Sequence, residues 1–151
     1  MNFLIILKLI LIFDFSVGTA DENVLPLLMP NISSDIIRED TYLCTAYETN
    51  PEYVTEFKPN APSSHSLHHM LIIGCETIDI AVNSERGHFW ECKYNPMMLC
   101  GPGRSTMIYA WSRNAPTFAL PEGSGFKVGG DSKINYLVLH VHYFDIDQTK
   151  S

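Results

Sequence analysis

The strongest constraint on the fold is the way proline, glycine and asparagine divide the chain into short apolar segments. Each segment is rich in Val, Ile, Thr, Tyr and Phe, the residues that favour strands. The segments are residues 41–49, 53–59, 65–75, 105–112, 125–130 and 134–144. Nine Gly and nine Pro would interrupt a long helix, and no stretch shows a convincing 3.6-residue period. The pattern predicts an all-β protein of the sandwich type.

Length and charge restrict the possible functions. A chain of 151 residues that is 46% hydrophobic can bury one sizeable core, which predicts a single domain. The formal net charge is -7, and no run of Lys or Arg provides the basic surface that phosphate backbones require. We therefore expect no nucleic-acid partner.

The first twenty residues differ from the rest. Residues 1–20 are mostly apolar and end in the small residues Gly18-Thr19-Ala20, a pattern typical of a secretory signal peptide cleaved after Ala20. An uncleaved membrane anchor is the alternative, but the segment is short for a span and Asp14 interrupts it. We expect residues 21–151 to form the mature domain, in the secretory-granule lumen or secreted, without strong membrane association.

Secretion changes how the four cysteines are interpreted. An even number of cysteines in an oxidising compartment favours two disulfides. The chain has no C-x-x-C pair, which disfavours a structural zinc ribbon. Cys44, Cys75, Cys92 and Cys100 allow three connectivities, among which the residues alone do not choose. The sequon at Asn31 is a candidate glycosylation site, although a chance match is nearly as frequent.

Histidines cluster in two of the expected strands. His140 and His142 are two residues apart, so their side chains share one face of a strand. His68 and His69 are adjacent and would point to opposite faces of a regular strand. Both can reach one ion only if a bulge or a strand end redirects one ring, or if the two bind through different ring nitrogens. Imidazole-rich sites without thiolates suit copper or zinc. For His65 and His88 we expect ordinary hydrogen-bonded roles, the commoner fate of a lone histidine.

Three blocks of sequence resemble a known family. "HHMLIIGC", "IYAWSRNAPTFALPEGSGFKVGG" and "YLVLHVHYFDI", in this order, are similar to the amino-terminal half of the copper type II, ascorbate-dependent monooxygenases, and most closely to the peptide-amidating members. The similarity extends from about Met29 to Asp147. It implies an antiparallel β-sandwich of jelly-roll type, expected to be incomplete at its C-terminal end.

The resemblance also implies site residues. One copper ion would be held by His68, His69 and His142, and the disulfides would join Cys44 with Cys92 and Cys75 with Cys100. Amidating members often have Gln where this chain has His140, so His140 is not carried over as a ligand. No catalytic residue is assigned within this chain.

The implied activity belongs to a two-copper enzyme. Ascorbate would supply electrons one at a time, and the copper of this half would store and pass one of them. A second copper, in a following domain that this chain lacks, would activate O2 and hydroxylate the terminal glycine of glycine-extended peptides. The chain alone is therefore expected to be inactive. A related hydroxylase acting on a small amine such as dopamine, and a secreted copper-binding domain without catalysis, are the alternatives.

Overall fold

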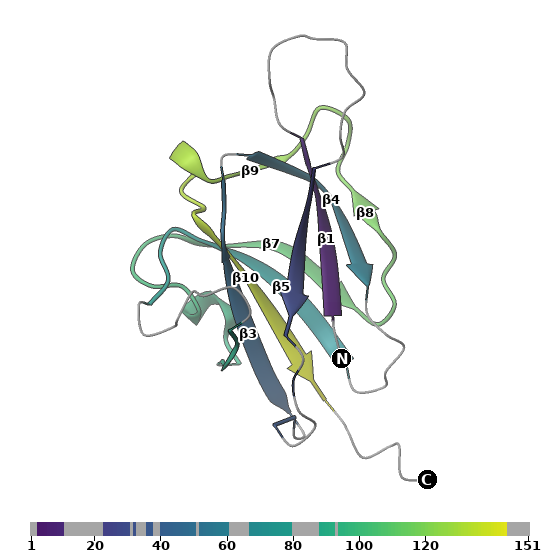
Figure 1. The fold of residues 1–151 in the computed structure, drawn as a ribbon, viewed down its shortest axis with the longest axis vertical. Helices are drawn as coiled ribbons and strands as arrows, with labels where there is room; N and C mark the ends of the chain where they lie inside the picture. Colours follow the sequence, from purple (N-terminus) through teal and green to yellow (C-terminus); the bar gives the residue numbers. More distant parts are fainter. Residues whose placement is uncertain are drawn as a thin grey trace.

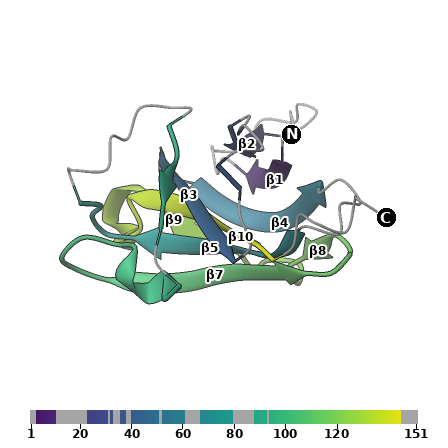
Figure 2. The same cartoon turned by 90° about the horizontal axis from the view of Figure 1, so that it is seen from below.

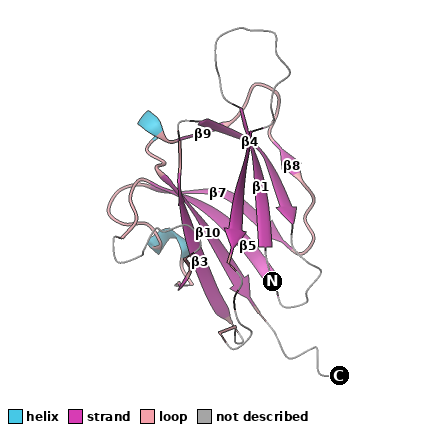
Figure 3. Cartoon of the chain, in the orientation of Figure 1, coloured by secondary structure: helices cyan, strands magenta, loops and turns pink. Residues whose placement is uncertain are grey.

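The computed structural model describes residues 3–10, 23–30, 32, 36–37, 40–50, 52–60, 67–79, 88–92 and 94–144. In this part of the chain the secondary structure consists of strands and two short 3-10 turns (Figure 3). The strands are β1 (Phe3–Ile10), β2 (Asn23–Met29), β3 (Thr41–Glu48), β4 (Glu52–Asn60), β5 (Leu67–Cys75), β6 (Trp90–Glu91), β7 (Ser105–Ser112), β8 (Phe118–Ala119), β9 (Phe126–Val128) and β10 (Tyr136–Tyr143). The turns are η1 (Pro96–Met98) and η2 (Gly130–Ser132). No helix of the described residues is long and apolar enough to cross a membrane.

The strands form two antiparallel sheets. One has the order β2-β1-β4-β8, with β9 also pairing with β4, and the other has the order β6-β3-β10-β5-β7. Strand β10 lies between β3 and β5, although these precede it by a long stretch of sequence (Figure 1). Figure 2 shows β1 and β2 on one side of the layer that contains β5 and β7. The expectation of an antiparallel β-sandwich is confirmed.

Apolar side chains of both sheets meet in the main core. From one sheet come Leu27, Met29, Val54, Phe57 and Val128, and from the other Leu43, Met70, Ile72, Tyr109, Trp111, Leu137, Leu139, Val141 and Tyr143. The Phe57 and Tyr109 rings stack across the two sheets, with centroids 4.4 Å apart. This contact fixes β4 over β7, and burial of these large side chains supplies most of the apolar stabilisation.

Strand β10 is buried on both faces. Its odd-numbered residues from Leu137 to Tyr143 enter the main core, whereas Val138 packs in a smaller cluster on the outer face with Cys44, Ile73 and Leu99. His140 and His142 follow Val138 on this outer face, because strand side chains alternate. The expectation that the two histidines share a face, opposite Leu139 and Val141, is confirmed.

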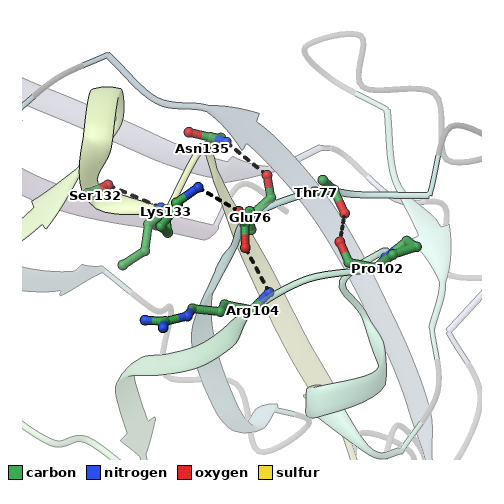
Figure 4. A network of polar contacts seen from close by, with 8 residues as sticks. Glu76, Thr77, Pro102, Arg104, Ser132, Lys133 and Asn135 are labelled. Atoms are coloured by element: carbon green, nitrogen blue, oxygen red, sulfur yellow. Dashed lines mark hydrogen bonds and ion pairs between the residues drawn. The ribbon is translucent and has the colours of Figure 1, made fainter.

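Polar contacts of Glu76 join three loops at the end of β5 that is remote from the histidines (Figure 4). The Glu76 carboxylate accepts a hydrogen bond from the Arg104 amide at 3.2 Å and pairs with the Lys133 ammonium at 3.2 Å. Its backbone carbonyl accepts from the Asn135 side-chain amide at 2.9 Å, and Thr77 donates to the Pro102 carbonyl. An open cleft of about 450 Å³ lies here, at the opposite end of β5 from His68 and His69.

The strand expectations hold for β3, β4, β5, β7, β9 and β10, with ends shifted by at most two residues. Strand β2 was not predicted, because Pro26 interrupts its short apolar run. Strand β1 falls within the expected signal peptide and lies between β2 and β4. Asn31, His65, residues 11–20 and the residues beyond Phe144 lie outside the described part, so the sequon, the cleavage site and the incomplete C-terminal end remain predictions.

Candidate metal centre

A β-bulge brings His68 and His69 to the same place. In the pairing of β10 with β5, His142 lies opposite His69, but the next residue, Tyr143, lies opposite Leu67. His68 is therefore the extra residue of a bulge, and a bulge changes the direction of the side chain it carries. A bulge is one of the arrangements that we expected to let the two adjacent histidines reach one ion.

The imidazole nitrogens of three histidines converge at this bulge. The Nδ1 atoms of His68 and His69 are 2.9 Å apart, and those of His142 and His68 are 3.3 Å apart. Two nitrogens bound at roughly 2.0–2.1 Å to one ion lie about 3 to 3.5 Å apart, so the spacing suits a shared metal. The residues come from β5 and β10, 74 positions apart for His68 and His142.

Burial and the neighbouring histidines favour the neutral form of His69. Burial, followed by the neighbouring His142, His140 and His68, lowers the pKa of His69 from 6.5 to about 4. A neutral imidazole has a free lone pair, which is the form that coordinates metal ions. At neutral pH His69 therefore does not have to lose a proton to act as a ligand.

Tyr42 of β3 and Asp40, just before that strand, orient His142. His142 donates from Nε2 to the Asp40 carboxylate at 2.7 Å, which leaves the lone pair of Nδ1 directed at His68. Tyr42 stacks on the His142 ring with centroids 4.1 Å apart and an interplanar angle of 4°, and its hydroxyl donates to Asp40 at 3.2 Å. Asp40 has a φ of 61°, a left-handed conformation that Asp tolerates better than most residues. A carboxylate on the outer nitrogen of a ligand histidine fixes its tautomer.

Sequence reasoning did not identify Asp40, Tyr42 or the nearby Phe144. Phe144 contacts the edge of the centre, with its ring centroid 5.4 Å from that of His68. Tyr42 lies opposite His142 only in the register of β3 with β10. Asp40 immediately precedes the expected strand 41–49, and Tyr42 is its second residue. Their role could be recognised only from the pairing of this strand with the distant strand that carries His142.

His140 lies beside the centre without joining it. Its side chain is fully buried, and its ring stacks near His69 with centroids 5.9 Å apart. The donor atoms of His140 group with the sulfurs of Cys44 and Cys92, whereas His68, His69 and His142 form a group of their own. His88 contributes its backbone carbonyl, which accepts a hydrogen bond from Thr45 at 2.8 Å.

Two disulfides hold the strands that carry the centre. Cys44 of β3 is bonded to Cys92, and Cys75 at the end of β5 is bonded to Cys100. These are the pairs that the resemblance implied. The bonded cysteines are 48 and 25 residues apart in the sequence. By restricting the unfolded chain, each disulfide raises the free energy of unfolding by roughly 3 to 4 kcal/mol in the loop-entropy model.

The donor set fits copper. Three imidazoles, each with its Nδ1 turned towards the others, and the absence of a thiolate from this group of described residues match the preference of copper and zinc for imidazole nitrogen. The three rings can therefore hold one copper ion.

Comparison with known proteins assigns the family. Residues 25–150 match the family described as copper type II ascorbate-dependent monooxygenase, N-terminal domain. The chain is 37% identical over 134 residues to peptidyl-glycine alpha-amidating monooxygenase A of Xenopus laevis, covering 87% of this chain and 13% of that protein. It is 36% identical over 130 residues to peptidylglycine alpha-amidating monooxygenase of Rattus norvegicus, covering 84% and 12%. The chain thus spans about an eighth of the relatives' length, and it belongs to the copper type II ascorbate-dependent monooxygenases, as a representative of their N-terminal domain.

Proposed function

We propose that this chain provides the copper-holding, electron-transferring half of a peptidylglycine α-hydroxylating monooxygenase. The observation that carries the proposal is the convergence of three Nδ1 atoms at the β5–β10 bulge. The relatives named for peptide amidation favour a peptide substrate over a small amine.

His68, His69 and His142 are the proposed copper ligands. When bound, copper supplies one-electron redox chemistry, with ascorbate as the reductant. The residues supply the rest: the bulge at His68 aligns two neighbouring rings, and Asp40 holds the third in the tautomer with a free Nδ1. Because all three donors are imidazoles, the site accepts both Cu(I) and Cu(II), as an electron store requires.

The substrates of the complete enzyme follow from the same proposal. They are O2, ascorbate and peptides that end in glycine. The family match is to an N-terminal domain, and the described residues bring together one group of three imidazoles. We therefore expect this chain to bind copper and exchange electrons with ascorbate, but not to hydroxylate peptides alone.

Metal counting and EPR test the proposal. The chain is loaded with Cu(II), dialysed and analysed for copper, and ascorbate is then added anaerobically. We expect one copper per chain and loss of the Cu(II) signal on reduction. A chain without copper, or one that holds copper inert to ascorbate, would contradict the electron-transfer function; inert copper would favour a simple copper-binding domain.

The proposal includes passage through the secretory pathway, which two disulfides in a small domain support. Cleavage after Ala20 would remove β1 from between β2 and β4. N-terminal sequencing of the protein secreted by animal cells decides this point, and treatment with a glycosidase tests a glycan at Asn31. A secreted protein that begins at Met1 would refute cleavage.

A further inference from the structure

A second group of metal-binding atoms lies next to the three-histidine centre. The sulfurs of Cys44 and Cys92 and a ring nitrogen of His140 lie within 4.8 Å of one another. Cys44 and His140 are direct cross-strand neighbours in β3 and β10, and both are fully buried. The backbone amide of Cys92 donates to the Tyr42 carbonyl at 2.9 Å, which holds the third member in place. Backbone pairing therefore fixes all three positions.

As a disulfide, the two sulfurs cannot act as thiolate ligands. We propose that reduction of Cys44–Cys92 creates a second copper site, in which two thiolates and the His140 imidazole bind one Cu(I) ion. Two sulfurs and one nitrogen are a soft donor set, which favours Cu(I). Zn(II) prefers four ligands, whereas this group of described residues offers three. Ascorbate, on which the family depends, keeps copper in the Cu(I) state.

The reduction is an exchange with a dithiol. A thiolate of the dithiol attacks the Cys92 sulfur, because Cys92 is half-buried whereas Cys44 is fully buried. The Cys44–Cys92 bond breaks, and a mixed disulfide forms with Cys92. The second sulfur of the dithiol then displaces Cys92. Two electrons and two protons pass to Cys44 and Cys92, the dithiol becomes a disulfide, and Cu(I) binding releases the thiol protons to solvent.

The backbone can accommodate the change. The Cα atoms of Cys44 and Cys92 are 5.8 Å apart. Metal–sulfur bonds of about 2.3 Å place two sulfurs about 4 Å apart, a separation that rotation about the Cα–Cβ bonds can reach from this spacing. Cys92 follows β6, which is an edge strand of only two residues, so small adjustments there leave the central strands unchanged.

The second disulfide provides an internal comparison. Cys75 is fully buried and Cys100 half-buried, as in the first pair. Among the described residues, however, no third donor groups with Cys75 and Cys100. The difference between the two disulfides is the histidine, and this makes His140 the residue that turns a reduced pair of cysteines into a metal site.

Copper counting before and after reduction tests the proposal. The full chain is titrated anaerobically with Cu(I) against a competing chelator, with and without a phosphine reductant, and the thiolate-to-copper charge-transfer band is recorded in the ultraviolet. We expect one copper in the oxidised chain and two in the reduced chain, with the band only in the latter. A reduced chain that still holds one copper and shows no band would overturn the proposal, as would loss of the β-sheet circular dichroism on reduction.

Two single variants separate the sites. His140→Ala should lower the affinity for the second copper by more than the roughly 10- to 100-fold that loss of a neighbouring group costs. It should leave the copper of the three-histidine centre in place. His142→Ala should remove the first copper and leave the band of the second. A C75S/C100S variant should retain the second copper and the charge-transfer band. A C44S/C92S variant should lose the second copper and the band, and should keep the copper of the three-histidine centre. Equal second-site affinity in wild type and His140→Ala would refute the role of His140, whatever the state of the three-histidine centre.

Discussion

Replacing Asp40 tests how far the centre depends on the carboxylate behind His142. The hydrogen bond from His142 to Asp40 is 2.7 Å long, and it joins a histidine side chain that is 6% exposed to a carboxylate that is 66% exposed. Loss of such a partner typically lowers metal affinity 10- to 100-fold. The exposure of Asp40 allows water to replace part of the bond, so we expect Asp40→Ala to weaken copper binding about 10-fold, or about 1.4 kcal/mol.

Asp40→Asn should lose less, because its amide oxygen still accepts the Nε2 proton and preserves the tautomer. The assay is a competitive chelator titration followed by the copper EPR signal. Asp131→Ala is the matched control: Asp131 is also exposed, but it lies in η2, before the start of β10, at least about 20 Å along that strand from His142. Equal affinities of the Asp40→Ala and Asp131→Ala chains, or a larger loss in Asp40→Asn than in Asp40→Ala, would refute the orienting role.

Four further predictions concern ligands, protons, loops and the core. His142→Ala should lose copper at chelator concentrations that leave His140→Ala loaded, and equal loss in the two would indicate a four-histidine site. Because the pKa of His69 is lowered from 6.5 to about 4, the folded metal-free chain binds fewer protons than the unfolded chain in this window. Its free energy of unfolding should fall as the pH drops from 6.5 to 4, more steeply in urea titrations of wild type than of His69→Asn; parallel curves would contradict this. Glu76→Gln should lower the melting temperature by weakening the contacts with the loops of β7 and β10, and an unchanged value at neutral pH would show that they are replaced by water. Phe57→Ala, at a fully buried position stacked on the opposite sheet, should cost about 3–5 kcal/mol in chemical denaturation; a cost below about 1 kcal/mol would mean that the core refills the space.

The sequence predicted those strands whose residue types alone favour extended structure. The Ile and Tyr residues of β7 and the Val and Tyr residues of β10 favour strands, and most of them are buried in the sheet. The strand preference of these residues and their burial therefore point to the same structure. Strand β2 escaped notice because a proline in its middle normally argues against a strand. In the structure Pro26 pairs with β1, a strand in residues that the sequence pattern assigns to a signal peptide.

The metal centre could be foreseen in its histidines but not in its surroundings. The period of two placed His140 and His142 on one face without distinguishing them. What distinguishes them in the structure are their cross-strand neighbours: His142 faces Tyr42 and His140 faces Cys44. Such neighbours depend on the register between strands that are far apart in the chain. Hydrophobic alternation opposes a slip of one residue in that register, but a slip of two residues keeps every side chain on its face.

The central place of β10 sets the order in which the protein can assemble. The contact between Asp40 and His142 joins residues 102 positions apart, and β3 and β5 are held together in their sheet by the strand between them. During synthesis β3 and β5 leave the ribosome long before β10, which is the strand that pairs with both of them. Pairings of such high contact order form slowly. The third imidazole is delivered by that same strand, so the nascent chain cannot complete the three-histidine group until its sheet has closed.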